Sequence, residues 1–413
     1  MIVSAVNLGC KVNEYETQSM LFQLKSAGHE IVEWPNFADL YIVNTCAVTN
    51  TGERKSRQFL SKILKINPNA KIVVTGCASQ NNASNFSKLE NVVAITGNQG
   101  KENILSIIEQ HNLTPIEINN DLYTETAKPL ETRARQYIKI QDGCNYFCSY
   151  CLIPYLRGRS RSRNLQDVLN EIRNTSASEI VLTGINMSDY RIDNKLALKT
   201  LVKEVDKLGK RFRISSIECN VLDDEMIDIL SKLKNFCHHF HLSLQSACND
   251  TLKRMNRRYT IEEFTKITKK LRETFPDCCI STDIIVGFKG EIDSEFENTV
   301  ENLKNIHFDF MHIFPYSERK GTLAEKLSNP VPSGVIKQRE KVLQQLNLEF
   351  KTKFYQKNLN TTHNVLVEIV DGNFCFGYTD NYIYTKFTGE HKIGDIVPIK
   401  LTSIVGDTMV GEE

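Results

Sequence analysis

Short apolar runs alternate with helical segments over most of this chain of 413 residues. The first hundred or so residues contain four such runs, at positions 2–6, 40–43, 72–74 and 92–95. Strands that alternate with helices favour a parallel sheet, because parallel neighbours need a long crossover connection. We therefore predict an α/β fold that begins with a doubly wound parallel domain over residues 1–115.

The alternation stops in a polar segment at 111–134, which we interpret as a linker, and then resumes from Gln136 to about Phe314. Six further apolar runs follow, with helical stretches between most of them, at 137–141, 179–183, 213–217, 239–244, 280–286 and 308–314. About six βα units predict a complete or partial barrel. We expect a central TIM-like (β/α)6 domain over residues 130–350.

The chain changes character again after a polar helical segment that begins at Val335. Alternating runs at 365–370, 375–378, 382–387, 396–401 and 409–411 are separated by turns rich in Gly, Asp and Asn. Short alternating strands with such turns are typical of a small antiparallel β-barrel. We predict an OB-like barrel over residues 355–413.

Composition excludes two classes of protein. No apolar run approaches the roughly 18 residues that span a bilayer, and the start of the chain lacks a signal-peptide pattern, so we expect a cytoplasmic protein without membrane association. Lys and Arg number 51 against 50 Asp and Glu, which gives a net charge of +1 and by itself neither predicts nor forbids nucleic acid. The twelve cysteines are more informative, because short cysteine spacings in a cytosolic protein indicate metal or redox chemistry.

Three cysteines form a CxxxCxxC motif directly after a predicted strand: Cys144, Cys148 and Cys151. Three thiolates in one loop can hold three irons of a 4Fe–4S cluster and leave the fourth iron open. The alternatives are a zinc site completed from a distance and buried cysteines without a metal. The motif after the first strand of a βα barrel resembles the radical S-adenosylmethionine (SAM) superfamily. That resemblance implies that SAM chelates the open iron and is cleaved to a 5′-deoxyadenosyl radical.

A second set, Cys10, Cys46 and Cys77, follows three predicted strands of the first domain. The carboxyl ends of parallel strands line one crevice of a doubly wound sheet, so these thiols either converge there or are three separate core cysteines. Together with the radical SAM motif and the C-terminal barrel, they make the chain resemble the methylthiotransferase family over almost its whole length. The resemblance implies a second 4Fe–4S cluster on these three cysteines and identifies the barrel as a TRAM domain, which binds RNA. The other six cysteines have no cluster-like spacing and are expected to pack in the core.

Polar residues at the ends of the barrel strands are candidates for binding SAM. Gly184 would let a ligand approach the backbone, Asn186 offers a donor and an acceptor, and Glu218 suits a ribose diol. An ordinary strand-end turn is the alternative for the first two. Together with what the resemblance implies, the candidate SAM-binding residues are Gly184, Asn186, Ser215, Glu218, Gln245 and Asp283.

Arginines concentrate beside the predicted radical site. Arginine pairs well with phosphate, whereas a solvated face or internal salt bridges are the alternative. Their location and the match to a Pro-Tyr-x-Arg-Gly-Arg stretch of the family favour phosphate. We predict tRNA contacts, some of which can instead serve the SAM carboxylate, at Arg157, Arg159, Arg161, Arg163, Arg254 and Arg257.

The segments Leu8-Gly-Cys-Lys-Val-Asn-Glu-Tyr-Glu16 and Gln141-Asp-Gly-Cys144 resemble the methylthiotransferases that act on N6-threonylcarbamoyladenosine beside the tRNA anticodon. The related isopentenyladenosine enzymes usually have Gln-Met in place of Lys11-Val12. The resemblance implies conversion of the base to its 2-methylthio derivative, with two 4Fe–4S clusters and SAM as cofactors. It also implies the tRNA anticodon stem-loop, an electron donor such as a flavodoxin and a sulfur source as partners. The alternatives are the isopentenyladenosine reaction, a ribosomal-protein substrate, or an iron–sulfur protein that binds tRNA without turnover.

Overall fold

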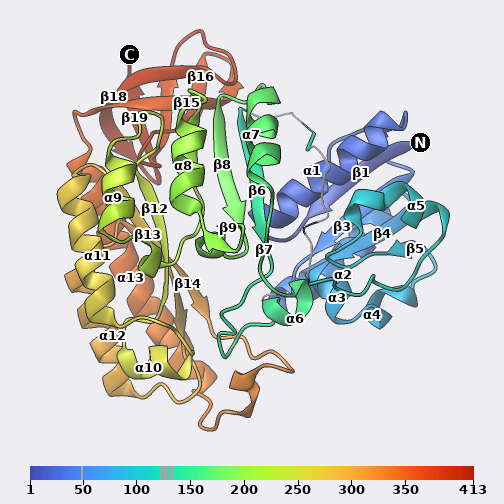
Figure 1. Cartoon of the computed structure of the whole chain (residues 1–413), viewed down its shortest axis with the longest axis horizontal. Helices are drawn as coiled ribbons and strands as arrows, with labels where there is room; N and C mark the ends of the chain where they lie inside the picture. Colours follow the sequence, from blue (N-terminus) through green and yellow to red (C-terminus); the bar gives the residue numbers. More distant parts are fainter. Residues whose placement is uncertain (48–49, 121–122, 124–128, 131–133) are drawn as a thin grey trace.

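The N-terminal domain of the computed structural model is a five-stranded parallel sheet with helices on both faces (Figure 1). Its strands lie in the order β2-β1-β3-β4-β5, with bounds β1 (Ile2–Asn7), β2 (Glu30–Ile31), β3 (Leu40–Thr45), β4 (Lys71–Gly76) and β5 (Val92–Ile95). The main connecting helices are α1 (Lys11–Ser26), α2 (Asn50–Ile66), α3 (Cys77–Asn81), α4 (Ser84–Ser87) and α5 (Ile104–Glu109). Tyr41 and Val43 pack in one apolar cluster while Leu40 and Ile42 pack in another, so both faces of β3 are covered. The prediction of a doubly wound domain is confirmed.

The structure describes residues 1–47, 50–120, 123, 129–130 and 134–413. Within the predicted linker, residues 112–120 contain no helix or strand, and most of the remaining linker lies outside the described residues. None of the helices described combines the length and apolar character that a bilayer crossing requires.

The central domain contains six parallel strands that form an open half-barrel (Figure 1). Along the arc these are β6 (Arg135–Asp142), β8 (Glu179–Gly184), β11 (Arg211–Ile214), β12 (His239–Gln245), β13 (Cys279–Val286) and β14 (Phe310–Pro315). Single bridges from Phe212 to Phe236 and from Ile217 to Leu242 join the two halves of the arc. Among the described residues β14 does not pair with β6, so the barrel is not closed. Of the two predicted forms, complete and partial, the structure has the partial one.

Amphipathic helices cover the convex side of this arc. Their apolar faces pack against the strands, and the two together form one hydrophobic core. They are α7 (Leu165–Asn174), α8 (Leu198–Asp206), α9 (Asp224–Ser231), α11 (Ile261–Thr274) and α12 (Asp293–Ile306). The shorter α6 (Ile153–Arg157) and α10 (Asn249–Arg254) follow the carboxyl ends of β6 and β12.

The C-terminal strands close into a five-stranded barrel in the order β15-β16-β17-β19-β18. Their bounds are β15 (Thr362–Asp371), β16 (Phe374–Tyr378), β17 (Tyr384–Thr388), β18 (Ile396–Val405) and β19 (Thr408–Glu412). The prediction of an entirely antiparallel barrel needs one correction, because β17 and β19 pair in parallel to complete the closure. The long helix α13 (Ser333–Lys357) leads into this barrel and places Phe354 and Tyr355 in its core.

The C-terminal barrel covers the end of the half-barrel at which the strands begin. Arg211 of β11 donates to the carbonyl oxygens of Asn364 and Tyr378, and Arg213 donates to those of Thr379 and Asp380. The loops that follow the strands therefore lie at the opposite end, which is where active sites of βα barrels are built.

A buried ion network joins the N-terminal domain to the half-barrel. Glu16 of α1 accepts hydrogen bonds from Lys139 of β6 and Arg157 of α6, both at 2.7 Å, and pairs with Lys101. Asp142 accepts from Lys139 at 2.9 Å. Burial alone would raise the pKa of the Glu16 carboxyl, but Arg157, Lys101 and Lys139 hold it well below its usual range. Glu16 therefore carries its charge in the interior and fixes the two domains to each other.

We expect Glu16→Gln to lower the free energy of unfolding by about 3–5 kcal/mol, because buried cations lose their shared carboxylate. The fluorescence of the lone Trp34, which packs against Tyr41 and Phe59, reports the N-terminal domain in urea. The exposed Glu109→Gln is the control and should change stability by no more than about 0.5 kcal/mol. Equal urea midpoints for the two variants would show that the network does not hold the domains.

Candidate functional site

The CxxxCxxC loop lies between the end of β6 and the start of α6. Gly143 begins the loop with a φ of +72°, and a Cβ there would lie 2.0 Å from the Arg159 carbonyl oxygen, so the turn requires glycine. The backbone N–H of Tyr146 donates to the Cys144 sulfur and that of Ile153 to the Cys151 sulfur, both at 3.4 Å. The fold thus presents three thiols with donors already directed at them.

Burial, together with the smaller effect of the neighbouring Cys148, raises the pKa of Cys144 to about 11 and that of Cys151 to about 12. Three thiols close enough to oppose each other's ionisation need a strong cation to become thiolates together. Iron of a 4Fe–4S cluster is such a cation, and the loop supplies three sulfur ligands with no fourth Cys or His between Gly143 and Leu152.

Several of the residues predicted to bind SAM surround this loop. Gly184 ends β8, where a Cβ would lie 3.0 Å from the Met187 side chain and 3.1 Å from that of Gln141. The Asn186 side chain lies beside Cys144 and interacts with its sulfur, which lowers the pKa of that thiol. Its buried Nδ2 has no oxygen acceptor among the described residues, so it can also donate to a ligand such as the SAM carboxylate.

Glu218 and Arg257 form a second part of the radical site. Arg257 pairs with Glu218, donates to the Ser243 carbonyl oxygen at 2.9 Å and donates to the Cys148 sulfur at 3.2 Å. Gln245 ends β12 with a φ of +70°, a backbone conformation that costs free energy for a residue other than glycine. Ser215 is buried and donates to Met187, whereas Asp283 lies on the concave face of the sheet beside His241.

The second cysteine set occupies one edge of the N-terminal sheet. Strands β1, β3 and β4 are neighbours in the sheet, with Asn7 opposite Asn44 and Thr45 opposite Gly76, so the chain leaves all three at one edge. The residues that follow are Cys10, Cys46 and Cys77. This edge includes the switch point between β1 and β3, where doubly wound sheets bind ligands.

Amides surround these thiols. The Cys10 thiol donates to Asn13 Oδ1 at 3.2 Å, and the Cys77 thiol donates to Asn98 Oδ1 at 3.6 Å. Cys10 and Cys77 interact electrostatically with each other. Asn13 also donates to Asn44 Oδ1 at 2.7 Å, which fixes its side chain.

The helix α6 connects the two cysteine sets. It begins two residues after Cys151, and its end binds the N-terminal domain: Asn98 donates to the Leu156 carbonyl oxygen at 2.8 Å, and Arg157 donates to Asn13 Oδ1 at 3.2 Å. The amides that contact Cys10 and Cys77 are therefore held by the segment that carries the radical motif.

Most of the arginines predicted to bind tRNA have partners within the protein. Arg157 is completely buried, Arg161 and Arg163 are 7% exposed, and all three pair with carboxylates or carbonyl oxygens of the protein. Arg161 and Arg163 nevertheless line a cavity of about 700 Å³, so a role of these two in tRNA binding stays a prediction, whereas Arg157 is enclosed by the ion network. Arg257 is likewise engaged at the radical site and Arg254 forms a two-point pair with Glu295, which leaves Arg159 as the exposed member of the predicted set.

Sequence reasoning missed the aromatic surroundings of the exposed arginines. Arg159 lies over the Phe147 ring at 4.5 Å, and Phe147 contacts the exposed Tyr155. Arg258, also exposed, lies over Tyr146 at 4.6 Å. The aromatic residues within the cysteine loop were the available signal. The six cysteines outside the two sets are all buried, as predicted: Cys219, Cys237, Cys248, Cys278, Cys279 and Cys375.

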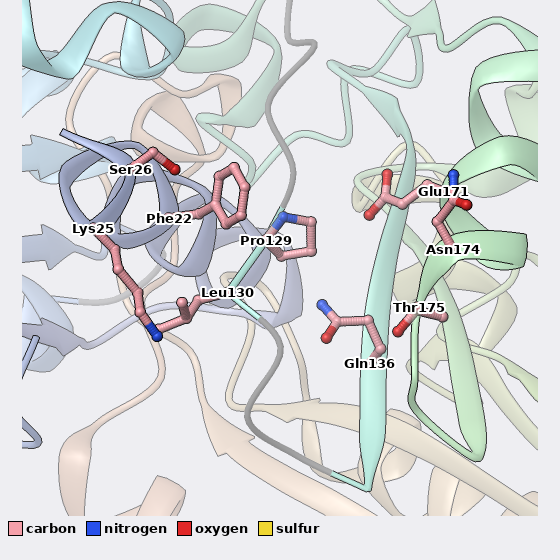
Figure 2. Close-up of a pocket in the computed structure, with 9 residues that line it drawn as sticks. All are labelled: Phe22, Lys25, Ser26, Pro129, Leu130, Gln136, Glu171, Asn174 and Thr175. Carbon is pink, nitrogen blue, oxygen red and sulfur yellow. The ribbon is translucent and has the colours of Figure 1, made fainter. Parts of the chain in front are cut away.

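A cavity of about 410 Å³ lies elsewhere, between the far end of α1 and α7 (Figure 2). Its lining includes Phe22 and Lys25 from α1, Leu130, and Glu171 from α7, but no cysteine. It is thus a space at the domain interface beside the C-terminal part of α1, whereas Cys10 precedes the start of that helix.

Comparison with known proteins agrees with this geometry. Residues 138–303 match the radical SAM superfamily, and residues 3–97 match the uncharacterized protein family UPF0004. A solved radical SAM methyltransferase, TsrM from Kitasatospora setae, superimposes with a TM-score of 0.54 over 76% of this chain and 72% of that protein, at 15% identity. The half-barrel and its cysteine loop therefore define an enzyme of the radical SAM class.

Relatives that match over nearly the whole chain identify the family within this class. The chain is 37% identical to the threonylcarbamoyladenosine tRNA methylthiotransferase MtaB of Bacillus subtilis, over 95% of this chain and 92% of that protein. It is 34% identical to MtaB of Aquifex aeolicus, over 97% and 100%, and 33% identical to the tRNA-2-methylthio-N(6)-dimethylallyladenosine synthase of Thermodesulfovibrio yellowstonii, over 98% and 96%. The chain belongs to the MtaB-type radical SAM methylthiotransferases, which are sulfur-group transferases.

We expect Cys148→Ala to lower the iron of the anaerobically reconstituted protein by about four atoms per chain, because one ligand of a 4Fe–4S cluster is lost. The buried Cys375→Ala in the C-terminal barrel is the matched control and should keep its iron. Iron and sulfide analysis measures both. Equal iron in the two variants would show that the loop does not bind the cluster.

Proposed function

We propose that this protein converts N6-threonylcarbamoyladenosine beside the tRNA anticodon to its 2-methylthio derivative. The observation that carries the proposal is the presence of two separate sets of three thiols joined by α6. The full-length similarity to threonylcarbamoyladenosine tRNA methylthiotransferases supports the same substrate.

The proposal includes two 4Fe–4S clusters, one on Cys144, Cys148 and Cys151 and one on Cys10, Cys46 and Cys77. When bound, the clusters and SAM supply the radical that removes hydrogen from carbon 2, the inserted sulfur and the methyl group. This cofactor chemistry is needed because an aromatic C–H offers no proton to a base at neutral pH.

The residues of the chain hold and orient these groups. Backbone N–H groups and Arg257 donate to the thiolates of the radical loop, and Asn186 offers its buried donor to SAM. In the first domain Asn13 and Asn98 orient Cys10 and Cys77. Glu16 and Arg157 keep both sets at a fixed separation.

The proposed partners follow from this reaction. tRNA is the substrate, an electron donor such as a flavodoxin supplies the electron for SAM cleavage, and a sulfur source restores the sulfur that is transferred. All of these act in the cytoplasm, which we propose as the location of the protein.

The function can be tested in a bacterial strain that lacks its own MtaB-type enzyme. We expect the chain to restore 2-methylthio-N6-threonylcarbamoyladenosine in tRNA, measured by mass spectrometry of nucleosides. A variant with Cys10, Cys46 and Cys77 all changed to Ala should not restore it, although it should keep about four irons per chain.

Two results would contradict the proposal. If the chain fails there but restores the methylthio group on dimethylallyladenosine in a strain that lacks the enzyme for that base, the substrate is that of the tRNA-2-methylthio-N(6)-dimethylallyladenosine synthases. If the triple variant keeps as much iron as the unchanged protein, the first domain holds no cluster.

Exposed arginines and aromatic rings around the cysteine loop form the proposed tRNA contact. Arg159, Tyr155 and Arg258 are exposed there, and each arginine lies over an aromatic ring of the loop. Arginine neutralises phosphate, and rings beside it can stack on unpaired bases. The anticodon loop presents both.

We expect Arg159→Gln and Arg258→Gln each to weaken tRNA binding by roughly two- to tenfold and to reduce the slope of log Kd against log salt by about 1. Arg173→Gln, an exposed arginine on α7 outside this surface, should change neither. Fluorescence anisotropy with labelled tRNA at several salt concentrations provides the measurement. Equal effects at Arg173 and Arg159 would mean that only overall charge matters.

A further inference from the structure

The concave face of the half-barrel carries polar side chains that the cysteine sets do not use. Asp283 of β13 lies opposite His312 of β14 in the sheet, and His241 of β12 lies opposite Ser281. His241 Nε2 is 3.2 Å from Asp283 Oδ2, and its Nδ1 is 2.9 Å from Ser281 Oγ. Both ring nitrogens of His241 are thus engaged within the protein.

His312 differs from His241. Its ring lies 5.6 Å from that of His241 and is exposed on the concave face. Among the described residues it contacts other rings but has no hydrogen-bond partner, so it remains able to donate to a ligand in this space.

Lys11 enters the same space from the N-terminal domain. It is the first residue of α1, directly after Cys10, and it interacts electrostatically with Asp283, Arg213 and His312. These interactions bring Lys11 within electrostatic reach of residues on β11, β13 and β14, and its position after Cys10 puts it beside the cysteine edge of the N-terminal sheet.

Lys11 differs from the other cations of this space, although Asp283 and Cys10 lie within its electrostatic reach. Arg135 and Arg213 both pair with Glu179, and Lys139 pairs with Glu16 and Asp142. In the described part of the chain no carboxylate lies within ion-pair distance of Lys11. A half-buried ammonium group without an ion-pair partner is stabilised by a ligand that supplies negative charge.

The chemistry of the proposed substrate supplies such a charge. The threonylcarbamoyl group ends in a carboxylate and is attached to N6 of adenine. N6 and carbon 2 lie on the same edge of the base, so the reacting carbon and the carboxylate are presented on one side. A lysine that adjoins the cluster ligand Cys10 is therefore positioned for the substituent.

We propose that Lys11, with His312 opposite it, binds the carboxylate of the threonylcarbamoyl group. An ammonium–carboxylate hydrogen bond is charge-assisted and stronger than a neutral one. This inference rests on the proposed substrate and adds the residues that distinguish it from an adenosine with an uncharged N6 substituent.

The test measures binding rather than turnover. Reconstituted full-length protein is titrated with fluorescent anticodon stem-loops that carry either threonylcarbamoyladenosine or unmodified adenosine at the same position. We expect Lys11→Met to weaken binding of the first RNA by at least about tenfold and to leave the second unchanged. Lys11→Arg, which keeps the charge, should recover part of the loss, and His312→Gln should act in the same direction as Lys11→Met.

Lys25→Met is the matched control, since Lys25 lies on the same helix but at the far end, where it lines the cavity of Figure 2. It should bind both RNAs as the unchanged protein does. The iron content of Lys11→Met must equal that of the unchanged protein, so that a loss of cluster at Cys10 is not mistaken for a loss of substrate contact.

The outcomes separate the two proposals. If the unchanged protein does not prefer the threonylcarbamoyl RNA, the proposed substrate is wrong. If it does and Lys11→Met keeps the preference, or weakens both RNAs equally, the carboxylate site is wrong while the substrate stands. A stoichiometric divalent metal that His312→Gln removes would also overturn the inference, because His241, Asp283 and His312 lie close enough to bind one.

Discussion

The buried carboxylate of Glu16 is the interaction on which the arrangement of this molecule depends. It is shared by Lys101 of its own domain and by Lys139 and Arg157 of the half-barrel. Arg157 of this network also lies near Cys77, one of the ligands of the proposed cluster in the first domain. A thiolate at Cys77 would be stabilised by the Arg157 guanidinium, so the proposed cluster and the docking of the domains would depend on the same arginine.

The fold could be predicted because its signals are local. Apolar runs of strand length, separated by helical segments, indicate parallel sheets without knowledge of the partners, and both sets of cysteines stand directly after such runs. The pairing of the strands determines where the first cysteine set lies. Because β1, β3 and β4 are parallel neighbours, the residues that follow them, Cys10, Cys46 and Cys77, lie at the same edge of the sheet. The parallel pairing of β17 with β19 was missed because closure of a barrel is a property of all five strands.

The arginines could not be assigned from sequence because their partners are remote along the chain. Arg157 meets Glu16 across 141 positions, and Arg257 meets Glu218 across 39. A cluster of arginines has the same one-dimensional pattern whether it neutralises RNA or carboxylates of its own protein. Only the location of Glu16 and Asp142 in the interior decides between the two. Arg159 remains available because it is the exposed arginine of that stretch, where it lies over the half-buried Phe147 ring.

Four residues at the start of α1 have different proposed roles. Cys10 is a proposed cluster ligand, Lys11 the proposed contact to substrate, Asn13 the amide that binds the Cys10 thiol, and Glu16 the link to the half-barrel. Asn13 and Glu16 are three residues apart and so share one helix face, whereas Lys11 points elsewhere, toward the concave sheet. A movement of α1 would therefore displace the proposed cluster ligand Cys10, the proposed substrate contact Lys11 and the domain link Glu16 together. Because Glu16 links α1 to Lys139 and Arg157 of the half-barrel, we expect discrimination among bases to come from side chains that contact the N6 substituent and not from closure of one domain on the other.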